Sequence, residues 1–406
     1  DMKRAAIDNL RAEEDPFRRT AYRIFAFLLA VGIALLLCVV VHLKRRIRVV
    51  VALAREAATV LREMPSLLLF PFLGVGSVAC FAGCLAHATV CIMTLRPKAI
   101  ARFGEKYAFI DVSDLQEDPE KAQWYLIYLL TFSALWAWFF HTGLFLTTIS
   151  GAVSQWYFYR ADPDDEDRAG VGIRSPGWWF GRPVALALGR ALRYHVGSLA
   201  LGSFILAAVK LPRLALEYAE GQLGVSGGNS AGRAVAQASR CCLCCIDRCL
   251  MFLTNYAFIN VAITGKSFCP AAHAAMELVA KYPVQLALDA FASSVVYWVA
   301  VLVVPTTNVV ITYALIPTAW GACGSFVAVC SFLVAHVAVS VYDVCMTTLF
   351  ICAVRDAEYF GGRYAPPSLR EAMEMPSVDA APGKVELQRW PGSGEALREP
   401  THEFET

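Results

Sequence analysis

One segment near the C-terminal end of the sequence carries polar side chains that could bind a solute or move a proton. They are spaced at i, i+4, i+7 and i+11 and are His336, Ser340, Asp343 and Thr347. At 3.6 residues per turn, this spacing puts all of them on one face of a helix. Their neighbours are largely apolar, and a carboxylate in such surroundings costs several kcal/mol unless it faces a partner or a wet cavity. We expect this polar stripe to face a bundle interior, where it either joins helices by hydrogen bonds or lines a substrate path and relays protons through a titratable histidine.

A second stripe is aromatic and lies in an earlier apolar segment. Its members recur at helical spacing: Tyr125, Tyr128, Phe132, Trp136, Phe139 and then Gly143, with Phe140 in the same turn. Aromatic faces attract a quaternary ammonium group, with about 2 kcal/mol or more for each desolvated contact. The alternative is that the rings pack against helices or face lipid, and Tyr125 lies where an interfacial anchor is expected. Trp136 lies deeper in the segment, which an anchoring role does not explain.

Other motifs point away from catalysis. The clustered cysteines are Cys241, Cys242, Cys244, Cys245 and Cys249. Their CxxC pairs overlap and have no second cluster, so a packing role or acylation at a membrane surface is favoured over a zinc site. The sequence has no nucleotide-binding loop, nucleophile elbow or HExxH motif. We therefore expect no cofactor, no metal and no enzyme, and we note Asp289 as a further candidate for a buried charge.

The elements that carry these residues are long apolar segments. The chain has 406 residues, of which 57% are hydrophobic and 17% charged, with a net charge of +2. This composition argues against a soluble enzyme and against a nucleic-acid-binding protein, which needs a clustered basic surface. About 20 apolar residues cross a hydrocarbon core about 30 Å thick. Seven segments qualify, approximately 24–43, 66–95, 125–150, 194–218, 241–265, 284–304 and 322–353. The predicted fold is all-α, a polytopic membrane helix bundle with about seven transmembrane helices.

Three regions follow from this pattern. They are a pre-membrane segment (1–21), a transmembrane helical domain (22–354) and a proline-rich, disordered cytosolic tail (355–406). Basic residues directly after the first span place that loop in the cytosol, so we expect the chain to start outside and to lack upstream spans. The segment 241–265 contains Asp247 and Arg248, and it either spans the membrane or is re-entrant.

Four stretches form an ordered set along the chain. They are Asp8–Arg11 before a span that ends in a basic cluster; Arg193–Gly197 with Gly202–Ile205 and Lys210–Arg213; the cysteine-rich segment running through Ala257 and Gly265 to Phe268–Cys269; and Leu333–His336 with Ser340–Asp343. In this order they resemble the choline transporter-like (CTL) family of multi-pass membrane proteins over nearly the whole chain except the tail. The resemblance implies a ten-helix fold with both termini in the cytosol, of which this chain would contain the last seven helices.

The resemblance also implies a function. It implies a carrier in the plasma membrane that moves choline, or a related quaternary or primary amine, by facilitated, alternating-access transport. Membrane lipids would surround it, and no nucleic acid would bind. The alternatives are a non-transporting membrane scaffold or partner subunit that retains the fold and, less well supported, an enzyme acting on lipid head groups.

The two stripes suggest how such a carrier would bind choline. Choline has a fixed positive charge and no N–H donor, so its site needs aromatic faces, a carboxylate and a polar group for the hydroxyl. The expected substrate-binding residues are Trp136, Tyr128, Phe139, Phe140, His336, Ser340 and Asp343. In this hypothesis Trp136 and its neighbours provide the aromatic faces and Asp343 the negative charge. His336 or Ser340 would bind the hydroxyl group.

Overall fold

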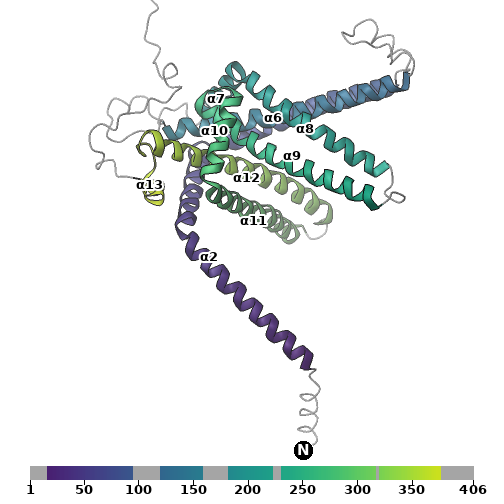
Figure 1. Ribbon diagram of the computed structural model, residues 1–406. Helices are drawn as coiled ribbons and strands as arrows, with labels where there is room; N and C mark the ends of the chain where they lie inside the picture. The colour runs from purple at the N-terminus through teal and green to yellow at the C-terminus, as the bar shows by residue number, and fades with distance from the viewer. Residues whose placement is uncertain (1–15, 95–118, 159–181, 223–229, 317–319, 376–406) are drawn as a thin grey trace, which may run out of the picture. The chain divides into compact units, whose positions relative to one another are not determined.

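The computed structural model describes residues 16–94, 119–158, 182–222, 230–316 and 320–375 (Figure 1). Its helices are α2 (Pro16–Glu63), α3 (Ser66–Thr94), α6 (Pro119–Phe158), α7 (Arg182–Tyr194), α8 (Val196–Gln222), α9 (Ser230–Thr264), α10 (Phe268–Lys281), α11 (Pro283–Leu315), α12 (Trp320–Tyr359) and α13 (Pro367–Met373). These described ranges contain no strand. The predicted all-α membrane fold is therefore confirmed.

Six of the helices are long and apolar enough to cross a membrane. Their apolar parts are Ser66–Thr94, Tyr125–Phe158, Val196–Ala215, Cys241–Thr264, Pro283–Leu315 and Gly321–Tyr359. All six begin within about two residues of the predicted segments, and three of them run several residues further. The segment that was predicted either to span or to be re-entrant lies in one continuous helix, α9. The first predicted span, 24–43, lies in α2, and many of its side chains are outside the described residues.

The structure divides into two units, Asp1–Val51 and Ala52–Thr406. Within its described part, the first unit is the N-terminal portion of α2, and Tyr22, Phe25 and Phe27 are exposed on it. Exposed apolar side chains of this kind are typical of a segment that contacts lipid or other helices. The second unit contains all six spanning helices and every site considered below.

Helix α6 is the element around which the second unit packs. It contacts α3, α7, α8, α9 and α12, and the C-terminal half of the helix is buried, including Ile149, Val153 and Trp156. Small residues permit these close contacts: a Cβ atom on Gly151 would lie 3.2 Å from the Cβ of Ala187 in α7. Membrane helices pack through small residues because lipid tails are as apolar as the side chains, so close van der Waals contact must supply the attraction.

The tightest packing of this kind occurs at Gly202 in α8. A Cβ atom there would lie 2.5 Å from the ring of Phe268 and 2.7 Å from the ring of Phe258. We therefore expect Gly202→Val to destabilise the purified chain by about 1–3 kcal/mol through overpacking. Thermal unfolding in detergent micelles measures this, with Gly197→Val as the matched control because nothing lies within 4 Å of a Cβ at Gly197. Equal melting temperatures for the two variants would contradict the packing described here.

The C-terminal end of α12 is folded further than the sequence predicted. Residues 355–375, which we assigned to the tail, complete α12 and form α13. Leu369 of α13 is fully buried, and the hydroxyl of Ser368 donates to Glu56 Oε1 at 2.6 Å. Pro366 and Pro367, two of the prolines that suggested disorder, instead lie at the start of a short helix, because proline is well suited to the first helical position. Residues 355–375 are therefore structured, and residues 376–406 of the predicted tail are outside the described part of the chain.

Candidate functional site

The polar stripe of α12 faces α11. The His336 ring lies 5.7 Å from the ring of Tyr297, and the hydroxyl of Thr347 donates to Asp289 Oδ2 at 3.4 Å. Between them, Asp343 interacts electrostatically with Asp289. The hydroxyl of Ser340 donates to the carbonyl of His336 on its own helix, at 2.7 Å, so this group does not join two helices. Three members of the stripe, His336, Asp343 and Thr347, therefore lie on the side of α12 that meets α11, although the His336 ring itself is exposed.

Asp289 of α11 and Asp343 of α12 are the centre of a group that we call the acidic cluster, together with Thr347 and Tyr256. Asp289 is only 2% exposed, whereas Asp343 is exposed. Tyr256, from α9, is buried and interacts electrostatically with both carboxylates. Among the described residues, Asp289 Oδ1 is buried without a hydrogen-bond partner. Three helices thus bring two carboxylates and one phenol together within the spanning segments.

The acidic cluster has the character of a cation site. Two carboxylates in a medium of low polarity repel each other strongly, so a positive charge or a proton between them is favoured. The buried oxygen of Asp289 lacks a donor, and the exposed carboxylate of Asp343 gives access to the pair. The sequence indicated Asp289 only as a buried charge and did not assign Tyr256 to the site. Their proximity to Asp343 depends on contacts between helices that no local pattern reports.

The aromatic stripe of α6 lies against α8. The indole nitrogen of Trp136 donates to the carbonyl of Ala200 at 3.0 Å, and its ring lies 5.7 Å from Phe204 in an edge-to-face arrangement. Phe139 is buried against Leu206 and Ala207. These contacts are those of a helix–helix interface.

The remaining predicted aromatic residues lie near this interface but make fewer contacts in it. Tyr128 is exposed, and Phe140 is half-buried with its ring edge-to-face to His141. The α6 stripe is therefore directed at α8, whereas the α12 stripe is directed at α11. The ring contacts and hydrogen bonds of the described residues assign the two stripes to different helix pairs.

Charged residues within α8 and α9 are paired with each other. Asp247 of α9 is 5% exposed, and its Oδ2 accepts hydrogen bonds from Lys210, at 2.9 Å, and from Arg213. This pairing explains how two helices that carry charges can be long membrane-spanning helices, because the charges meet one another rather than lipid.

No group of three or more metal-ligating side chains occurs within the described ranges.

The sequence also matches a family of known proteins. The family model described as plasma-membrane choline transporter matches residues 27–358. Choline transporter-like protein 5 of Xenopus tropicalis is 26% identical over 392 residues, covering 86% of this chain and 52% of that protein. Choline transporter-like protein 2 of Xenopus laevis is 28% identical, with 86% and 53% covered. For choline transporter-like protein 1 of Mus musculus the identity is 26%, with 87% and 51% covered.

These matches extend across the spanning helices and the acidic cluster. The chain spans about half the length of the curated relatives that it matches. Because the family model covers most of the chain, from α2 to the end of α12, the resemblance seen in the sequence is confirmed. The chain is an integral, multi-pass membrane protein and belongs to the plasma-membrane choline transporter family.

Proposed function

We propose that this chain is the membrane-embedded part of a plasma-membrane carrier that moves choline, or a related organic cation, by facilitated, alternating-access transport. The family match and the names of the relatives support a transporter, and the acidic cluster supports a cationic substrate. The observation that carries the proposal is the pair Asp289 and Asp343, in which a buried carboxylate oxygen without a donor lies beside an exposed carboxylate.

The chemistry of choline fits this pair. A trimethylammonium group cannot donate a strong hydrogen bond, so it is held by negative charge and by aromatic faces. Asp343 and Asp289 supply the charge, and Tyr256 supplies an aromatic face with Phe252 4.6 Å from its ring. Thr347 is the hydroxyl-bearing neighbour, already hydrogen-bonded to Asp289. In this arrangement Trp136 and Phe139 stabilise the α6–α8 interface instead of contacting choline.

The direction of transport follows from the charge of the substrate. Inward movement of one positive charge is favoured by about 2.3 kcal/mol for each 100 mV of inside-negative potential. A carrier of this kind therefore accumulates choline without coupling to another ion. Transport by such a carrier requires that choline can reach the carboxylates alternately from the two sides of the membrane.

Uptake of radiolabelled choline by proteoliposomes that contain the purified full chain tests this proposal. A carrier accumulates unmodified label, and the accumulated amount rises when an inside-negative potassium diffusion potential is imposed. A scaffold gives the same label content as protein-free liposomes. An enzyme of head-group metabolism converts the label into a new compound, which thin-layer chromatography separates from choline. Either of the last two results would refute the proposal.

A further inference from the structure

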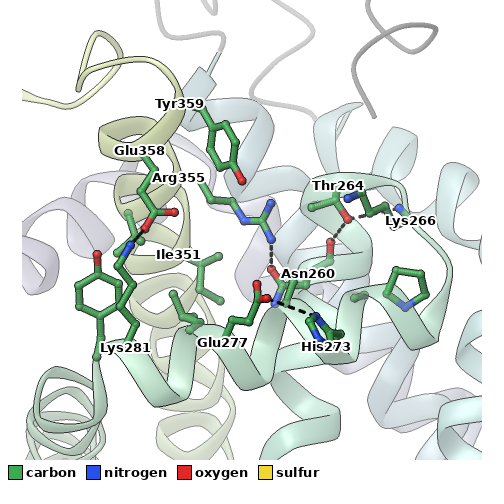
Figure 2. A pocket seen from close by; sticks show the side chains of 16 residues that line it. Asn260, Thr264, Lys266, His273, Glu277, Lys281, Ile351, Arg355, Glu358 and Tyr359 are labelled. Atoms are coloured by element: carbon green, nitrogen blue, oxygen red, sulfur yellow. Dashed lines mark hydrogen bonds and ion pairs between the residues drawn. The ribbon is translucent and has the colours of Figure 1, made fainter. Parts of the chain in front are cut away.

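A second polar site lies away from the acidic cluster, in a cavity between α9, α10 and α12 (Figure 2). Its volume is about 600 Å³, and its lining includes none of the four residues of the acidic cluster. Cavities of roughly 300–1,000 Å³ are typical of sites for small molecules. The transport proposal assigns no role to this cavity.

Hydrogen-bond donors converge on one part of the lining. Arg355 Nη2 donates to Asn260 Oδ1 at 2.7 Å, and Figure 2 shows these two side chains together in the middle of the view. Because Oδ1 accepts from the guanidinium, the amide orientation is fixed and Nδ2 is directed elsewhere. Asn260 is 1% exposed, and its Nδ2 has no hydrogen-bond partner in the described part of the chain. A buried donor of this kind is costly unless a ligand or a water molecule accepts from it.

Carboxylates occupy other positions on the same lining. Glu277 lies beside His273, with 3.4 Å between Oε1 and Nδ1, and Glu358 accepts a hydrogen bond from Lys281. That hydrogen bond raises the pKa of Lys281, so its ammonium group stays protonated. The ring of Tyr282 also lines the cavity. The cavity therefore offers a guanidinium, an amide donor and the ammonium groups of Lys266 and Lys281 together with the carboxylate of Glu277, a combination that can bind both ends of a zwitterion.

We propose that this cavity binds a phosphate ester of a cationic amino alcohol, the chemistry shared by free phosphocholine and by the head group of phosphatidylcholine. Arg355 and Asn260 Nδ2 hold the phosphate, because guanidinium and amide N–H groups match its oxygens. Glu277 attracts the ammonium end, whereas Glu358 and the ring of Tyr282 already contact the ammonium group of Lys281.

Phosphocholine titration tests the soluble form of this ligand. The full chain is placed in nanodiscs of phosphatidylglycerol, which has no cationic head group, and phosphocholine binding is measured by isothermal titration calorimetry. Asn260→Asp is expected to weaken binding by about tenfold or more, because it sets a carboxylate against the phosphate. The substituted side chain keeps its shape and still accepts from Arg355, so the fold is retained. Asn255→Asp on the same helix, outside the cavity lining, is the matched control and is expected to bind as the wild type does.

Native mass spectrometry distinguishes the lipid source. In this experiment the chain is released from phosphatidylcholine nanodiscs, and a retained phosphatidylcholine molecule is detected by its mass. The ligand is a lipid head group if phosphocholine does not bind and the wild type retains this lipid. In that case Asn260→Asp loses the lipid and Asn255→Asp keeps it. Phosphocholine binding with the expected sensitivity assigns the soluble ester. The proposal is overturned if neither ligand binds or if Asn260→Asp changes the binding of neither.

Discussion

Asp343→Asn is expected to lower the kcat/KM for choline uptake into proteoliposomes by about thirtyfold. The side chain keeps its size but loses the charge that, with Asp289, holds a cation within the spanning helices. Removing one member of a charge pair formed with the substrate costs about 2 kcal/mol, which corresponds to about thirtyfold in affinity. Because Asp343 is exposed, neutralising it leaves the packing of α11 against α12 intact, and the variant is expected to fold.

Two further variants make this result specific. Asp343→Glu retains the charge and is expected to recover part of the uptake. Glu371→Gln removes an exposed carboxylate of α13, outside the spanning helices, and is expected to leave uptake unchanged. If Asp343→Asn, present in the liposome membrane in the same amount as the wild type, transports choline with unchanged kinetics, the acidic cluster is not the substrate site. If the variant instead fails to fold, the α12 stripe has a structural role.

The spanning helices were predictable because their length and apolar composition are local properties. A run of about twenty apolar residues has few alternatives to a membrane-spanning helix, so α3, α6, α8, α9, α11 and α12 could be located to within a few residues except where they extend beyond the membrane. The face that carries His336 and Asp343 was predictable for the same reason, since a helix repeats every 3.6 residues. Proline-rich composition was a poorer guide, and it concealed α13.

The composition of the site was less predictable, because it depends on how helices meet. Nothing in the sequence around Asp343 indicates that Asp289 and Tyr256 lie beside it, some 50 and 90 positions earlier in the chain. The same holds for Trp136, whose indole reaches a backbone carbonyl of α8. An aromatic stripe suits both a cation site and a helix interface, and only the position of α8 distinguishes them. Asp289 itself was recognisable as a buried charge, so the useful signal was an ionisable residue inside a spanning segment.

Asp356 holds together the end of α12, α6 and the segment that leads to α13. Its side chain is fully buried, and Oδ2 accepts from the hydroxyl of Tyr157, at 3.0 Å, and from the backbone N–H of Tyr364, at 3.1 Å. Its own carbonyl accepts from the N–H of Gly362, at 3.0 Å, where a φ of 81° favours glycine. Arg370 then donates to the carbonyl of Gly362 at 3.0 Å. One carboxylate thus satisfies donors from two separate elements.

Asp356→Ala is therefore expected to destabilise the chain by about 3 kcal/mol, because it leaves two buried donors unpaired and each costs about 1–3 kcal/mol. Thermal unfolding in detergent micelles, followed by tryptophan fluorescence, measures the loss as a lower melting temperature. Tyr157→Phe removes one of the two donors and is expected to have a smaller effect. Since the hydroxyl is no longer left unpaired when both partners are removed, the double variant should be more stable than the sum of the single effects predicts. Simple additivity would show that Tyr157 and Asp356 are not coupled and that the C-terminal segment is held by other contacts.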